Sequence, residues 1–188
     1  MANVKLNPIL ERIRGQVGDL VFRRFQGRTI LSRKPDLAGV VPSEAQLAHK
    51  ERFRQAALYG KVVMADAAQK SLYVEAAKER GKPVFSLTVA DYLNPPVVTG
   101  VDLSGYAGVV GDAITIAAVD DFEVSGVQVQ LSDGDGSELE AGSALRGQDG
   151  FWVYTATTAV APGTTVRVVV TAIDRPGGTG EATADKVL

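Results

Sequence analysis

The alternation of apolar and polar residues in the second half of the chain most constrains the fold. In the stretch 118–131, Val127, Val129 and Leu131 alternate with Gln128 and Gln130. Successive side chains of a β-strand point to opposite faces, so this spacing puts the apolar residues on one side. The pattern predicts an antiparallel strand with one face on a core and the other in water.

Strand-like segments recur at short intervals after Pro96. Turns rich in Gly, Asp and Pro separate them, which is typical of a β-sandwich. Trp152 and Tyr154, two residues apart, are expected to share the core-facing side. In residues 166–172, apolar residues occupy more positions than simple alternation would give. This predicts a central strand that is covered on both faces. We expect strands at about 97–103, 112–119, 123–132, 137–145, 150–158, 164–174 and 181–188.

The first half of the chain predicts a β-hairpin followed by helices. Residues 15–34 carry β-formers on either side of Gln26-Gly27, where glycine supplies the positive φ of a tight turn. A helix is expected from Ser43 to about Met64, with Gln46 as the capping-box partner of Ser43. Its predicted apolar stripe contains Ala45, Ala48, Phe53, Ala56, Ala57 and Val63.

Two further helices are expected before the proline pair. Asp66 is placed to cap a helix over 67–80 that Gly81 ends. The segment 84–93 fits a short helix or a strand, and we favour the helix. Asn94-Pro95-Pro96 then stops regular structure and predicts a domain boundary.

The predicted fold class is therefore α+β with two domains. Residues 1–94 form a hairpin-plus-helices domain, and residues 95–188 form an all-β sandwich. The first half holds 16 Lys and Arg against 9 Asp and Glu, whereas the second holds 4 against 13. Opposite charges either attract within one molecule or join different patches of two copies head to tail. Both interpretations stay open at this point.

Composition and motifs give no indication of catalysis. The chain has no cysteine, which excludes disulfides, thiolate metal sites and cysteine nucleophiles. No nucleophile elbow, phosphate loop or dinucleotide motif is present. The single histidine, His49, has no partner pattern for catalysis or metal binding. We therefore expect no enzyme activity, no cofactor and no small-molecule substrate.

Targeting signals are also missing from the sequence. The N-terminal residues lack the apolar run of a secretory signal, and no segment has the length of a membrane span. We expect synthesis in the cytoplasm without a signal peptide, and a final location that includes a virion or an extracellular assembly.

The acidic turn Asp133-Gly-Asp135-Gly-Ser137 resembles the opening of a calcium loop. Asp133, Asp135 and Glu140 would be the ligands. The helical calcium loop needs glycine at the sixth position and glutamate at the twelfth, where this chain has Glu138 and Ala144. A hairpin turn explains the same residues without an ion, so we expect no metal here.

The hairpin is basic and contains aromatic residues. Its candidate interface residues are Phe22, Arg23, Arg24, Phe25, Arg28 and Arg33. Arginines could bind phosphates while aromatics stack on bases. The carboxylates of the same half weaken a phosphate-binding field and weigh against nucleic acid. The alternative is a sheet edge whose arginines keep it soluble or dock on an acidic neighbour.

Two parts of the chain resemble known proteins. The pattern is Gly15, Gly18, Val21, Phe22, Phe25, Gly27, Arg28, Ile30, Leu31, Arg33 and Pro35, followed by Pro42 through Leu47. It resembles small uncharacterised bacterial proteins associated with phage-like or surface structures. The seven-strand second half is similar to bacterial immunoglobulin-like modules, here without their disulfide. Such resemblance implies binding or spacing roles and not a reaction.

These observations favour a structural protein. The leading interpretation is a homo-oligomeric, non-enzymatic subunit that self-assembles head to tail into a filament, tube or virion-like surface. The alternative is a monomeric immunoglobulin-like binding module for a cell-surface polymer or carbohydrate, with Phe151 or Tyr106 as exposed aromatics.

Overall fold

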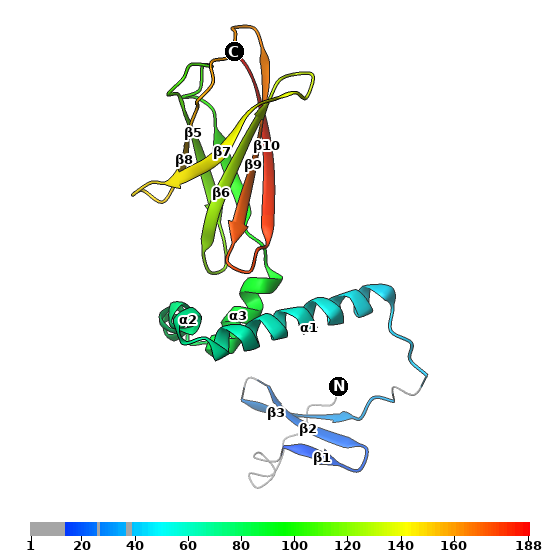
Figure 1. Cartoon of the computed structure of the whole chain (residues 1–188). Helices are drawn as coiled ribbons and strands as arrows, with labels where there is room; N and C mark the ends of the chain where they lie inside the picture. Colours follow the sequence, from blue (N-terminus) through cyan, green and yellow to red (C-terminus); the bar gives the residue numbers. More distant parts are fainter. Residues whose placement is uncertain (1–13, 26, 37–38) are drawn as a thin grey trace. The chain divides into compact units, whose positions relative to one another are not determined.

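A computed structural model describes residues 14–25, 27–36 and 39–188. The chain divides into two compact units, Met1–Glu44 and Ala45–Leu188. The class is α+β: three helices and antiparallel sheets, the larger of which forms a nearly closed sandwich (Figure 1). The linker Asn94-Pro95-Pro96 therefore lies inside the second unit. A domain boundary at this linker stays a prediction.

The first unit contains a three-stranded antiparallel sheet. Its strands are β1 (Gly15–Val17), β2 (Leu20–Phe25) and β3 (Arg28–Arg33), in that spatial order. Gly27 has φ +77° between β2 and β3, as a tight turn requires, whereas Gln26 lies outside the described residues. The predicted hairpin is confirmed, and β1 is an additional strand. None of the described residues of this unit is buried.

Three helices begin the second unit: α1 (Glu44–Ala65), α2 (Ala67–Glu79) and α3 (Val84–Leu93). Asp66 caps α2 as predicted, because its Oδ1 accepts hydrogen bonds from the backbone N–H of Ala68 and Gln69 at 2.8 and 3.2 Å. The segment 84–93 is helical, so the preference for a helix over a strand is confirmed. No helix among the described residues is long and apolar enough to span a membrane.

The apolar stripe predicted for α1 is largely wrong. Of its six members only Ala56 and Val63 are buried, and Phe53 is 50% exposed. Helical spacing cannot tell which turns meet a neighbour. The buried part of α1 lies against α3 along its later turns, where a Cβ on Gly60 would lie 2.8 Å from Thr88 Oγ1.

Seven strands follow the helices. Their spatial order is β10-β9-β6-β7-β8-β5-β4, all antiparallel. The end strands β4 and β10 also approach each other, since a Cβ on Gly180 would clash with the Pro96 carbonyl oxygen. Their bounds are β4 Val97–Asp102, β5 Ala113–Val119, β6 Val124–Ser132, β7 Glu138–Arg146, β8 Trp152–Thr155, β9 Thr165–Asp174 and β10 Thr179–Val187. The predicted strands are confirmed with small shifts at their ends.

The interior of the sandwich consists of alternate residues of these strands. Trp152 and Tyr154 both face the core, as predicted, with 7% and 4% of their surface exposed. The prediction of a doubly covered β9 is wrong: its residues alternate between buried and less buried, and Arg167 is exposed. One face of β9 lies on the core, while Val169 and Thr171 on the other are only partly covered. The fully buried core includes Tyr106, Ile114, Ile116, Val127, Val129, Leu131, Val166, Val168, Val170 and Ala172.

Candidate functional site

The six predicted interface residues lie on the two faces of the β1–β3 sheet. The strand register pairs Phe22 with Leu31, Arg24 with Thr29 and Leu20 with Arg33. Because directly paired residues share a face, Phe22, Arg24 and Arg33 lie on one side, here termed the Phe22 face. The intervening residues Arg23, Phe25 and Arg28 lie on the other, termed the Phe25 face. Each face thus combines one aromatic residue with two arginines.

Apolar side chains also occupy both faces. Val17, Leu20 and Leu31 accompany Phe22, while Val21 and Ile30 accompany Phe25. Within the described residues, Phe25 is 61% exposed and Val17 65% exposed. A small sheet needs three or more strands with a hydrophobic face, or packing against a helix, to be stable by itself. Both faces of this sheet therefore offer apolar surface for packing.

The arginines of the sheet are weakly engaged. Arg23 donates a 3.3 Å hydrogen bond to Ser32 Oγ, and Arg33 lies 3.8 Å from Asp19 in an exposed ion pair. Such exposed pairs contribute little to stability. Arg24 and Arg28 have no ion pair within the described part of the chain. These two cations are free to meet an external acidic group.

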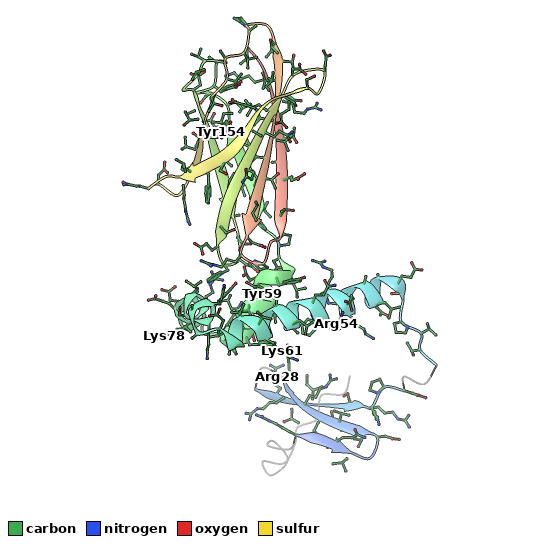
Figure 2. All side chains as sticks on the ribbon, viewed as in Figure 1. Arg28, Arg54, Tyr59, Lys61, Lys78 and Tyr154 are labelled. Carbon is green, nitrogen blue, oxygen red and sulfur yellow. The ribbon has the colours of Figure 1, made fainter. Side chains whose placement is uncertain are left out.

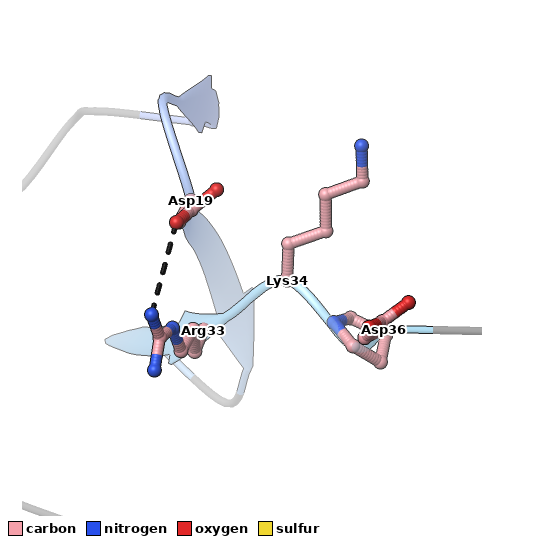
Figure 3. Close-up of a pocket in the computed structure, with 5 residues that line it drawn as sticks. Asp19, Arg33, Lys34 and Asp36 are labelled. Atoms are coloured by element: carbon pink, nitrogen blue, oxygen red, sulfur yellow. Dashed lines mark ion pairs between the residues drawn. The ribbon is translucent and has the colours of Figure 1, made fainter. Parts of the chain in front are cut away.

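An open pocket lies beside Arg33 at the end of β3. Asp19, Arg33, Lys34, Pro35 and Asp36 line its wall, and its volume is about 710 Å³ (Figure 3). The two acids and two bases balance each other, and none of these side chains is buried. The described part of the lining thus shows no excess charge that would select a small molecule.

The acidic residues proposed as calcium ligands serve local structure. Asp133 Oδ1 accepts hydrogen bonds from the N–H groups of Asp135 and Ser137, which makes the turn between β6 and β7. Glu140 is buried, and its Oε2 accepts from Thr157 N, Thr157 Oγ1 and Thr158 N. Within the described ranges no group of three acidic or histidine side chains is arranged to hold a metal ion.

The two aromatics of the alternative interpretation differ in position. Tyr106 is fully buried, so its proposed exposure is wrong: the turn after β4 places the ring in the core. Phe151 is 44% exposed, and Leu145 on β7 is 77% exposed. A groove of about 220 Å³ lies nearby between β7 and β8, and Tyr154 is among the residues that line it (Figure 2).

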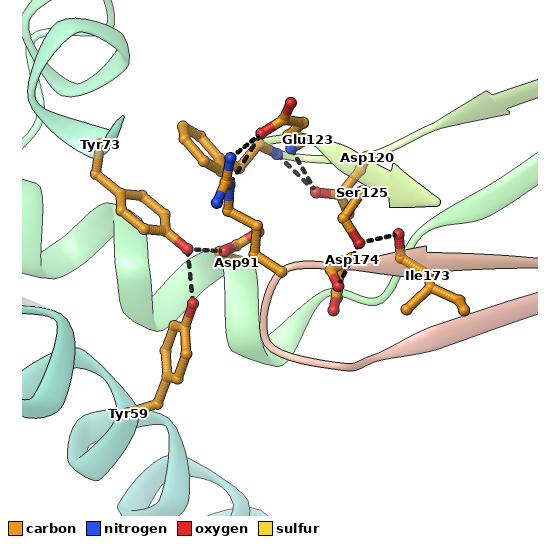
Figure 4. Close-up of polar contacts among 10 residues, drawn as sticks. Tyr59, Tyr73, Asp91, Asp120, Glu123, Ser125, Ile173 and Asp174 are labelled. Atoms are coloured by element: carbon orange, nitrogen blue, oxygen red, sulfur yellow. Dashed lines mark hydrogen bonds and ion pairs between the residues drawn. The ribbon is translucent and has the colours of Figure 1, made fainter. Parts of the chain in front are cut away.

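The pattern of the sequence did not reveal a buried polar junction between the helices and the sandwich. Tyr59 on α1, Tyr73 on α2 and Asp91 on α3 form a chain of hydrogen bonds (Figure 4). The two tyrosine oxygens are 2.8 Å apart, and Tyr73 Oη donates to Asp91 Oδ2 at 2.5 Å. Burial raises the pKa of both tyrosines, so they stay protonated.

Two carboxylates of the sandwich extend this junction. Asp120 Oδ2 accepts hydrogen bonds from Phe122 N and Glu123 N, and Asp174 Oδ1 accepts from Gly178 N. Asp91 and Asp174 are 0% and 2% exposed. One oxygen of each acid, namely Asp91 Oδ1, Asp120 Oδ1 and Asp174 Oδ2, is buried without a hydrogen-bond partner. Three such oxygens in one described region need donors, which a proton on one of the acids, a cation or bound water would supply.

The junction raises the pKa of Asp91 to about 7. Burial is the largest cause, and the negative charges of Asp120 and Asp174 act in the same direction. The hydrogen bond from Tyr73 opposes them. Burial, followed by the Asp120 charge, also raises the pKa of Asp174. Arg175 does not neutralise the acids, because it pairs with Glu123 at 2.8 Å.

Comparisons with known proteins show no family for this chain. No protein-family model matches the sequence, and no curated protein matches it. CopC from Methylosinus trichosporium OB3b is 14% identical, with a TM-score of 0.36 over 48% of this chain and 89% of that one. The Br derivative of BhCBM56, a carbohydrate-binding module, is 16% identical, with a TM-score of 0.33 over 50% and 92%. Similarity at this level carries no argument about function.

Proposed function

We propose that this chain is a non-enzymatic structural subunit that assembles head to tail with copies of itself. The main support for this proposal is the composition of the β1–β3 sheet. Both of its faces have apolar residues and arginines, and none of its described residues is buried. Contact with a neighbour would bury the apolar surface that this small sheet leaves exposed. The product would be a filament, a tube or a virion-like surface.

Charge supports the choice of partner. The first half of the chain carries an excess of Lys and Arg, and the second half an excess of Asp and Glu. A head-to-tail contact joins two different patches and can repeat without closing. Arg24 and Arg28, which lack ion pairs in the described structure, would meet acidic side chains of the next copy's sandwich. The sandwich would act as an immunoglobulin-like spacer, outside or on the surface of a particle.

The test is charge reversal on the sheet. Arg23→Glu with Arg24→Glu should abolish assembly and leave the circular dichroism spectrum unchanged. The matched control is Lys61→Glu with Lys82→Glu, which changes the net charge equally at exposed positions outside the sheet (Lys61 in Figure 2). Sedimentation velocity at several protein and salt concentrations gives the particle size. A wild-type protein that stays monomeric at millimolar concentration in dilute buffer would refute the proposal.

A monomeric binding module is the second candidate. Two exposed apolar residues favour it, namely Leu145, which lines the groove at Tyr154, and Phe151 just before β8, because polymer-binding sites place apolar rings on a surface. Binding to insoluble polysaccharides, lost in Phe151→Ala and retained in the arginine double variant, would select this function over assembly.

A further inference from the structure

We infer that one proton shared between Asp91 and Asp120 holds the helices on the end of the sandwich, and that its loss loosens this junction. The argument starts from two buried oxygens, Asp91 Oδ1 and Asp120 Oδ1, that have no donor. Asp91 belongs to α3, and Asp120 to the turn between β5 and β6. A hydrogen bond between the two side chains is possible only when one of them is protonated.

The other contacts decide which acid carries the proton. Asp120 Oδ2 already accepts two hydrogen bonds from the backbone N–H groups of its own turn, at 2.8 and 3.0 Å. Asp91 is fully buried and has one donor, the Tyr73 hydroxyl. The proton therefore resides on Asp91 Oδ1 and is donated to Asp120 Oδ1.

Every element at the junction contributes a titratable or charged group. α1 and α2 contribute Tyr59 and Tyr73, whose hydroxyls are neutral. The end of β9 contributes Asp174, with one oxygen unpartnered. Arg175 and Glu123 pair with each other at the rim. Arg80 on α2 also reaches the junction, where it donates to the Asp121 carbonyl oxygen. Deprotonated Asp91 would thus face the carboxylates of Asp120 and Asp174.

The consequence is a loosened junction above neutral pH. Repulsion among Asp91, Asp120 and Asp174 would then act across the contact between α3 and the sandwich, which the chain crosses only through Asn94-Pro95-Pro96. The rise of the Asp91 pKa to about 7 agrees with this geometry. The junction would be closed in mildly acidic solution and looser in alkaline solution.

Carbon-13 NMR of the full-length protein tests the proton. The Asp91 carboxyl, assigned by its absence in Asp91→Asn, should titrate near neutral pH. Asp120→Asn should lower the midpoint, because a negative neighbour is lost, and Tyr73→Phe should raise it, because the charged form loses a donor. Titration of Asp91 below pH 5, or a midpoint unchanged by Asp120→Asn, would overturn the inference.

Spin labels test the loosening. The chain has no cysteine, so spin labels attach only at the two introduced residues. These are Lys61→Cys on α1 and Gln128→Cys on β6, both at exposed positions. The distribution of distances between the two labels is measured on monomeric protein. It should be narrow at pH 5 and at least twice as broad at pH 9. In the Asp91→Asn background it should be narrow at both. Equal widths in the wild type at both pH values would refute the loosening, whatever the NMR midpoint.

Discussion

The ring of Phe122 stacks on the ring of Tyr73, with centroids 4.1 Å apart and planes 17° from parallel. Phe122 follows β5 in the sandwich and Tyr73 lies on α2, so this stack fastens the helices to the sandwich. Arg175 lies over the Phe122 ring at 6.0 Å, and Arg80 on α2 donates to the Asp121 carbonyl oxygen. The second unit therefore has a specific apolar contact at the same junction as its buried acids.

Phe122→Ala should weaken this connection more than it weakens the sandwich. Loss of a large, partly buried ring costs about 2–4 kcal/mol of unfolding free energy. We expect urea unfolding followed by far-ultraviolet circular dichroism to separate into two transitions, with the helices melting first. Phe151→Ala, which removes an exposed ring elsewhere on the sandwich, is the control and should leave a single transition. A single, unshifted transition in Phe122→Ala would contradict the role assigned to the stack.

Gly180→Ala should destabilise the sandwich. A Cβ at this position clashes with the Pro96 carbonyl oxygen, which is backbone and cannot rotate away. We expect a loss of about 1–3 kcal/mol. Gly126→Ala is the matched control: it also lies in a strand, but its Cβ would meet nothing within 4 Å. Thermal unfolding should show a lower midpoint for Gly180→Ala alone, and equal midpoints would show that β4 and β10 can separate at no cost.

Local patterns predicted the elements, because a strand or a helix cap depends on residues close in sequence. Val127, Val129 and Leu131 mark β6 by alternation, and Asp66 marks the start of α2 by its side-chain acceptor. The exposed Phe53 was mistaken for core, because helical spacing shows a stripe but not the partner that covers it. Tyr106 was predicted to be exposed, because the local sequence does not show that the rest of the sandwich covers its ring.

The junction depends on residues that are distant in sequence. Tyr73, Asp91, Asp120 and Asp174 come from α2, α3 and two parts of the sandwich, and no local period relates them. One signal was present: Asp91 is the single charged residue in the apolar segment 84–93. A carboxylate in an apolar helix needs a buried partner or a proton. The identity of the partners required the fold.

The two faces of the β1–β3 sheet should contribute unequally to assembly. Phe25 is 61% exposed, whereas Phe22 is half-buried and Arg33 on its face already pairs with Asp19. We expect Arg23→Glu with Arg28→Glu, on the Phe25 face, to weaken assembly at least about tenfold. Arg24→Glu with Arg33→Glu makes the same charge change on the Phe22 face and should have a smaller effect. Sedimentation equilibrium measures both, and the reverse order would assign the interface to the Phe22 face.

The stability of the second unit should fall as the pH rises from about 5 to 8. Asp91 titrates near 3.8 when unfolded and near 7 when folded, so the folded state holds the extra proton between these values. Its contribution is fully present below the unfolded pKa and is lost as the pH passes through the folded pKa. The full difference corresponds to roughly 4 kcal/mol, and only part of it is lost between pH 5 and 8. The raised pKa of Asp174 acts in the same direction.

Other shifted carboxylates act outside this range. Backbone hydrogen bonds lower the pKa values of Asp102 and Asp112, so their contributions are lost only when the pH falls below their ordinary values. Urea unfolding at pH 5, 6, 7 and 8 should therefore give a steady decline in the wild type. Asp91→Asn, which cannot titrate, should give a much shallower decline, because only Asp174 keeps a raised pKa. A wild-type stability that stays level or increases over this interval would mean that Asp91 is already ionised in the folded protein at pH 5.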